Sequence, residues 1–147
     1  IMSDSYESMQ GEEVRQSIIK FGKIGDWFMG TLVDDTRRVP NRLNPAKGEQ
    51  VVYRFKIISG SWHDIKDKVA ADKPTEPLRG EVWSYFGNTV TQDQMRNAKI
   101  GQIVAMKFKL EKPPTQPGYN PTKVIAIKLG AMDDTYQGEL EDVDMPV

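Results

Sequence analysis

The side chains best suited to chemistry in this chain are cations spread over short, β-rich segments. Lysine and arginine bind phosphates, and single-stranded nucleic acids are held by such cations together with flat rings on which unpaired bases stack. Alternatively, a basic side chain on an outer strand face only solubilises the edge of a sheet. The cations that we predict to lie on a binding surface are Arg37, Arg38, Arg42, Lys47, Arg54, Lys56, Lys107, Lys109 and Lys123.

The aromatic residues divide between an expected core and an expected surface. Alternation along 51–59 and 102–110 places Tyr53, Phe55 and Phe108 on the apolar, inward side of the strands. A half-buried sheet produces this pattern, with the basic residues on its other face.

Trp62 and Tyr119 lie in long polar connections, where a large ring has no obvious core to fill. We therefore expect both to be exposed for base stacking. Trp83 and Tyr85 share one face of 80–86, and we include them in the binding surface. The pattern fits a buried Trp83 equally well, because a small β domain needs large interior groups.

The charge of the chain is unevenly distributed. The formal net charge is -1, from 20 Lys+Arg and 21 Asp+Glu. Residues 1–13 hold four acids and 131–147 hold six, and neither segment holds a base, so 14–130 carries about +9. Near-neutrality therefore hides a cationic body between an acidic arm at 1–13 and an acidic tail at 131–147.

Composition excludes several classes of protein. Without cysteine, the chain has no disulfide, thiolate metal site or cysteine nucleophile. The longest apolar runs, 103–106 and 124–127, have four residues, so we expect no membrane span and a cytoplasmic protein. His63-Asp64 resembles a catalytic dyad, but no Ser or Cys motif accompanies it. Asp34-Asp35 resembles a magnesium site, but two adjacent acids that open an arginine-rich loop more often pair with those arginines or cap a turn. We predict no enzyme, no metal and no cofactor.

Five strand-like runs and one helix must position these residues. The runs are 27–33, 51–59, 80–86, 102–110 and 122–129, and a short helix is predicted over 91–98, between the third and fourth runs. Residues 14–21 fit a short helix or an extra strand. Long connections at 34–50, 60–79 and 111–121 are typical of functional loops.

This order of elements resembles the oligonucleotide/oligosaccharide-binding (OB) fold, a five-stranded Greek-key barrel. Gly25-Asp26 before the first run, Val82-Trp83 in the third and Lys99–Val104 opening the fourth resemble single-stranded-DNA-binding proteins of phage type. The resemblance covers about 22–130 and implies an all-β, five-stranded OB barrel over 14–130. It also implies binding by the face of the second and third strands and by the loops between strands 1–2 and 4–5.

The end of the chain resembles the acidic tip of bacterial single-stranded-DNA-binding proteins, which docks replication and repair proteins. The matching residues are Asp142, Asp144, Met145, Pro146 and Val147, with Val147 where that family has Phe. We therefore expect the tail to recruit partners or to compete for the binding groove.

The resemblance implies a sequence-tolerant single-stranded-DNA-binding protein of replication or recombination, in a bacterium or a phage-infected cell. Two alternatives stay open: an OB-fold adaptor of a virion or replisome, and an RNA-binding OB factor. The sequence leaves the oligomeric state open.

Overall fold

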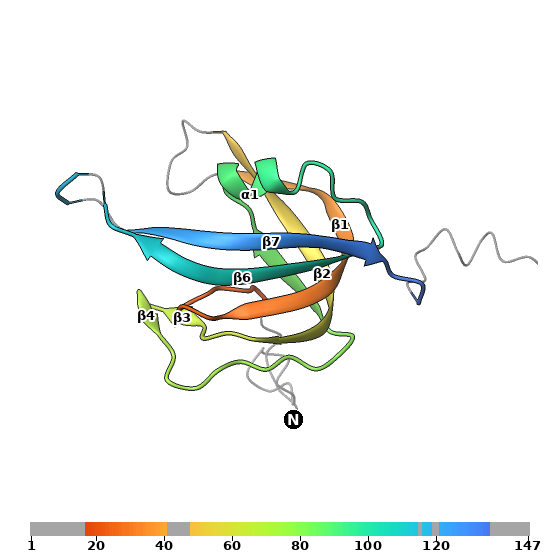
Figure 1. Ribbon diagram of the computed structural model, residues 1–147, viewed down its shortest axis with the longest axis horizontal. Coiled ribbons are helices and arrows are strands. Elements are labelled where there is room, and N and C mark those ends of the chain that lie inside the picture. The colour runs from red at the N-terminus through yellow and green to blue at the C-terminus, as the bar shows by residue number, and fades with distance from the viewer. Residues whose placement is uncertain (1–16, 41–47, 115, 119–120, 136–147) are drawn as a thin grey trace, which may run out of the picture.

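The computed structural model describes residues 17–40, 48–114, 116–118 and 121–135 of the chain. Within these ranges the chain forms seven strands and one short helix (Figure 1). The elements are β1 (Trp27–Pro40), β2 (Glu49–Ser61), β3 (Ile65–Lys66), β4 (Val69–Ala70), β5 (Val82–Phe86), α1 (Thr89–Gln94), β6 (Gln102–Lys112) and β7 (Thr122–Met132).

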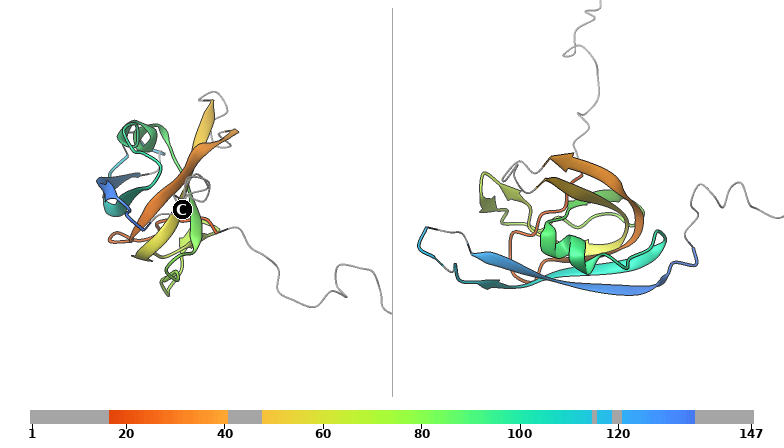
Figure 2. Two further views of the ribbon diagram at one scale, coloured as in Figure 1. Left: turned by 90° about the vertical axis from the view of Figure 1, so that its right-hand side faces the viewer. Right: turned by 90° about the horizontal axis from the view of Figure 1, so that it is seen from above.

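Five of the strands form one antiparallel sheet in the order β5-β2-β1-β6-β7, and β3 and β4 form a separate hairpin. The sheet is strongly curved, and β6 and β7 project as a long hairpin (Figures 1 and 2). The predicted all-β class is confirmed as a mostly β protein with one five-stranded antiparallel sheet. The sheet is not closed into a barrel, since its order ends at β5 and β7 without pairing between them.

Residues 17–19 run beside β5 in extended conformation, so the helix alternative is wrong for the described part of 14–21. The amide of Ile19 donates to the Ser84 carbonyl (2.8 Å), and the amide of Ser84 donates to the Ser17 carbonyl (2.8 Å). Ile19 and Phe21 are buried in the core. This segment therefore satisfies backbone groups that β5 would otherwise leave unpaired at the sheet edge.

The core lies on the inner face of the curved sheet. Phe28 of β1, Phe55 of β2 and Phe108 of β6 are fully buried, and the rings of Phe28 and Phe55 are 5.0 Å apart. The inward register predicted for Tyr53, Phe55 and Phe108 is confirmed. Alternation works here because the neighbouring strands supply apolar side chains on the same face.

Trp62 is a core residue, so the prediction that it is exposed for stacking is wrong. Its exposed fraction is 0%, and its ring meets that of Trp83 edge to face at 5.0 Å. Backbone hydrogen bonds join Trp62 to Thr75 in both directions, at 3.1 and 2.6 Å. The connection after β2 folds back on itself and keeps Trp62 inside.

All three long connections predicted from the sequence are partly strand: β1, β2 and β6 extend into them, and 60–79 also holds the β3–β4 hairpin. The long connection expected over 34–50 is shorter, because β1 continues to Pro40 and β2 begins at Glu49. In the β6–β7 pair, a register shift between Phe108 and Leu110 changes the face to which the following side chains of β6 point. Leu110 is therefore 45% exposed instead of following Phe108 into the core.

A short helix does lie between the third and fourth long strands, as predicted, but it begins two residues earlier. The Asn88 side chain caps it by accepting a hydrogen bond from the Thr91 amide at 2.9 Å. Thr91 of the helix and Met95, the residue that caps its C-terminal end, are buried. The one α-helix in the described part of the chain has six residues, and none that is long and apolar enough to cross a membrane occurs there.

Candidate nucleic-acid interface

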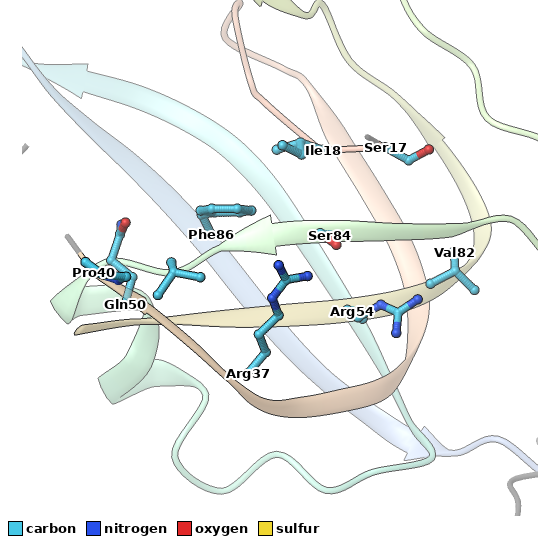
Figure 3. A pocket seen from close by; sticks show the side chains of 10 residues that line it. Ser17, Ile18, Arg37, Pro40, Gln50, Arg54, Val82, Ser84 and Phe86 are labelled. Atoms are coloured by element: carbon cyan, nitrogen blue, oxygen red, sulfur yellow. The ribbon is translucent and has the colours of Figure 1, made fainter. Parts of the chain in front are cut away.

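A groove of about 690 Å³ opens on the outer face of the sheet, over β5, β2 and the end of β1 (Figure 3). We call it the arginine groove. Its lining comprises Ser17, Ile18, Arg37, Val39, Pro40, Gln50, Arg54, Val82, Ser84 and Phe86. The described lining thus combines two guanidinium groups with apolar and small polar side chains, and contains no acid.

Arg37 and Arg38 are separated by the alternation of β1. Arg37 pairs with Val52, lines the groove and lies over β2 and β5 in Figure 3. Arg38 pairs with Val51, and its Nη1 donates to the Asp35 carbonyl at 2.7 Å. Only Arg37 of this pair lines the groove, which corrects the prediction that both arginines belong to one surface.

Arg54 projects from β2 beside Asp34 of β1, its partner in the register. The Asp34 carboxylate bonds within its own turn, since its Oδ1 accepts hydrogen bonds from the amide and hydroxyl of Thr36 at 2.9 and 2.7 Å. These bonds lower the pKa of Asp34, and the charge of Arg54 acts in the same direction. Neither Arg54 nor Arg37 forms an ion pair with any residue that the structure describes.

The aromatic ring that β5 offers to the groove is Phe86. Its exposed fraction is 39%, equal to that of Val82 on the same outward face. Trp83 and Tyr85 point inward and pack against the core, where Tyr85 lies 5.9 Å from Phe21. The assignment of Trp83 and Tyr85 to the binding surface is therefore corrected, and Phe86 takes their place. Either face of 80–86 was compatible with its alternation, so the sequence pattern alone did not identify Phe86.

Lys56 continues the outer face from the groove towards the middle of β1. It is exposed and pairs with Thr31 on β1 and Val82 on β5. Thr31 donates a hydrogen bond to Asp133 at 2.6 Å. Hydrogen bonds from Thr135 and Thr31, with the charge of Lys56, lower the pKa of Asp133 to about 2. One acid at the beginning of the acidic tail thus lies among the outer-face cations.

Lys107 and Lys109 are exposed on β6, as predicted, and line a second hollow with Lys128 of β7. Lys123 faces the other way. Its Nζ donates to the Phe21 carbonyl at 2.7 Å and lies 5.4 Å from the centre of the Phe108 ring. Lys123 is exposed, as predicted, but it shares the side of β7 that carries Ile125 and Ile127, so it does not join Lys107 and Lys109 on the outer face. This parity was readable from the sequence and identifies Lys128 as the outward cation.

Several predicted residues lie outside the described residues. They are Arg42, Lys47, Tyr119, Asp142, Asp144, Met145, Pro146 and Val147. Their assignments stay predictions, and none of them is among the described residues that line the arginine groove.

His63 contacts an acid, but a different one from its sequence neighbour Asp64. The His63 amide and Nδ1 lie 2.9 and 2.8 Å from the carboxylate of buried Asp26, which also accepts from the Lys23 amide at 2.9 Å. Although burial raises the pKa of Asp26, the hydrogen bonds from His63 and Lys23 outweigh it and lower the pKa overall. The hydrogen bonds between Asp26 and His63 thus link the turn before β1 to the residues that follow β2. Among the described residues, no cluster of three or more potential metal ligands is present.

Comparisons with protein-family models, with curated proteins and with solved structures found no match to this chain.

Proposed function

We propose that this protein binds single-stranded DNA with little sequence preference, in the arginine groove. The observation that carries the proposal is that Arg37 and Arg54, neither of them ion-paired within the described chain, line one groove together with a partly exposed Phe86, and that no acid is among the lining residues. Guanidinium groups bind phosphate through charge-assisted hydrogen bonds. An exposed phenyl ring stacks on any base, because every base has a flat face.

The strand order supports assigning the domain to the OB class. Leaving aside the β3–β4 hairpin, the first four long strands lie in the spatial order β6-β1-β2-β5. In a Greek key the fourth strand returns to lie beside the first, which gives this order. The OB fold is a partly open Greek-key barrel that binds on its second and third strands, and here the arginine groove lies over β2 and β5.

The polar groups of the groove fit a sequence-tolerant binder. Ser84 and Gln50 are small hydrogen-bonding side chains beside the arginines, and Val82 and Phe86 supply apolar surface. Most of the affinity would come from phosphate neutralisation, since each neutralised phosphate releases counterions. Binding would therefore weaken steeply as salt rises, and the protein would coat exposed strands during replication or recombination.

The acidic tail would act on the same surface. Asp133 is held on the outer face by Thr31, and its pKa responds to the charge of Lys56. We propose that the acids that follow Asp133 in the sequence, being covalently attached to the same chain, compete with DNA for these cations at high effective concentration or recruit other proteins. Removing 136–147, which leaves β7 intact, should tighten DNA binding most at low salt. Unchanged affinity would refute the competition.

The central experiment compares two neighbouring arginines that differ in the face they occupy. Binding of a fluorescent oligo-dT is measured by anisotropy over a range of salt concentrations for Arg37→Met, Arg54→Met and the control Arg38→Met. All three variants remove one positive charge, so a purely long-range effect would be equal in all. We expect the two groove variants to weaken binding about 10- to 100-fold and to flatten the salt dependence.

Two outcomes would change the proposal. If the wild-type protein does not bind oligo-dT at any salt concentration, the groove is not a DNA site. The same conclusion follows if Arg38→Met weakens binding as much as the groove variants do. If oligo-U binds more tightly than oligo-dT, the ligand is RNA, because only RNA offers the 2′-hydroxyl.

A further inference from the structure

A second hollow, of about 290 Å³, lies on the outer face of β1, β6 and β7, at the opposite end of β1 from Arg37. We call it the Trp27 cleft. The side chains that give it its character are Trp27, Ala105, Lys107, Lys109, Ala126 and Lys128. In the sheet register Trp27 pairs with Lys107, which pairs with Ala126, while Ala105 pairs with Lys128.

Small neighbours leave Trp27 accessible. Because Ala105 and Ala126 carry only methyl groups, no large side chain of β6 or β7 covers the ring from their positions. Trp27 is consequently half-buried, in contrast to Trp62 at 0% exposure in the core. A large ring on the outward face of a strand adds nothing to the inner core.

The charges around Trp27 are of one sign. Lys107, Lys109 and Lys128 are exposed, and none forms an ion pair with a described residue. No acid lines the described cleft. A flat ring among three free ammonium groups suits a ligand that combines a planar base with a phosphate.

We infer that the Trp27 cleft is a second contact for single-stranded DNA, in which a base stacks on Trp27 while Lys107 and Lys128 bind the flanking phosphates. This inference rests on the proposed function and extends its binding path. Trp27 and Arg37 are ten residues apart on β1, about 33 Å if the strand were straight. Between them Lys56 lies on the same outer face, paired with Thr31.

The path makes binding at the cleft dependent on the length of the DNA. Single OB domains cover about 4–16 nucleotides. An oligo-dT of about five nucleotides, near the lower end of that range, occupies one contact, whereas one of about 15 nucleotides reaches both. The longer oligomer should therefore bind more tightly than the shorter one, and this difference in affinity should depend on Trp27.

The test uses the full chain with Trp27→Leu, the double variant Lys107→Gln/Lys128→Gln, and the control Lys66→Gln/Lys68→Gln in the β3–β4 hairpin. The control removes the same charge outside both hollows. We expect the Trp27 and Lys107/Lys128 variants to bind the longer oligomer about 5- to 100-fold more weakly. The control should bind it as wild type does.

Fluorescence gives a second, more local measurement. Trp62 and Trp83 pack in or against the core, so stacking on Trp27 should account for most of the quenching by DNA. That quenching should largely disappear in Trp27→Phe. Should Trp27→Leu impair folding in thermal unfolding, the Lys107/Lys128 variant still tests the cleft, because its changes are on exposed side chains.

The outcomes separate this inference from the proposed function. Wild-type affinity of both cleft variants for the longer oligomer, with unchanged quenching in Trp27→Phe, would overturn the inference. The lysines would then only shield Trp27 with their aliphatic stems, and the arginine groove would stand if Arg37→Met still weakened binding. Loss of binding in the cleft variants alone would support the cleft and overturn the groove. Absence of binding to either oligomer would overturn both.

Discussion

The inner and outer faces of the five-stranded sheet are made by the same strands but differ in almost every side chain. On β2, Phe55 is fully buried, whereas its neighbours Arg54 and Lys56 are exposed on the other side. On β6, Phe108 is fully buried and Lys107 is exposed. Successive residues of a strand point to opposite faces, so one strand serves the core and the surface at once. Stability and ligand binding should therefore respond to different substitutions within the same strand.

Trp27 and Trp62, which lie at the same end of the antiparallel β1–β2 pair, show the same contrast. Trp27 begins β1 on the outer face, and Trp62 follows β2 and lies in the core beside Phe28 and Trp83. The two residues have the same chemistry but different surroundings. Their different roles follow from which side of the sheet each ring occupies.

The largest effect should come from Trp62→Ala, because it empties a fully buried site. We expect a loss of about 3–5 kcal/mol in the free energy of unfolding, measured by urea denaturation with circular dichroism. Trp27→Ala should cost less than half as much, since the ring is half-buried and makes fewer contacts. Equal losses would show that Trp27 belongs to the core, and would remove the contrast between the faces.

A smaller effect on stability should follow from Asp26→Asn, which weakens the link between Asp26 and His63. The expected loss at neutral pH is about 1–3 kcal/mol. Because folding lowers the pKa of Asp26, its carboxylate stabilises the protein above the unfolded value of 3.8, and this contribution is lost as pH falls through the lower folded pKa. Wild type should thus lose its advantage over Asp26→Asn in acid. A constant difference between pH 7 and pH 3 in urea titrations would contradict this assignment.

The smallest effect should separate two lysines of β7 that lie on opposite faces. Lys128→Met should weaken binding of the longer oligo-dT about three- to tenfold, with little change in stability. Lys123→Met should leave binding almost unchanged and cost about 1 kcal/mol of stability, since it removes a hydrogen bond to the Phe21 carbonyl and a contact with Phe108. Anisotropy and thermal unfolding of the two variants check both parts. The reverse pattern would mean that the faces of β7 are wrongly assigned.

Local alternation predicted much of the fold. It located the five long strands, the inward register of Phe55 and Phe108, and a short helix before β6. The faces of 80–86 were ambiguous, because both sides of this run carry large apolar residues. The structure resolves that ambiguity through contacts distant in sequence, such as that of Tyr85 with Phe21.

The errors arise where long-range packing or a register shift decides the outcome. Trp62 looked exposed because its partners Trp83 and Thr75 are distant in the sequence. Leu110 followed the inward pattern until the shift after Phe108 reversed it. Lys123 and Lys128 differ in parity along β7, so the sequence alone distinguishes the lysine on the inward side from the one on the outer face. The arginine groove was predicted in part, through Arg37 and Arg54.

Two residues beside the proposed DNA path, Ser17 and Asp133, matter for where a label can be attached. Ser17 lines the arginine groove, and Asp133 lies on the outer face beside Lys56. A label attached at either of these residues would therefore lie next to the proposed DNA path and would mask it. The β3–β4 turn, where Asp67 and Lys68 have φ of 53° and 66°, lines neither hollow, so a dye attached there would stay clear of both. Labelling there would leave the outer face clear for surface-tethered or single-molecule measurements.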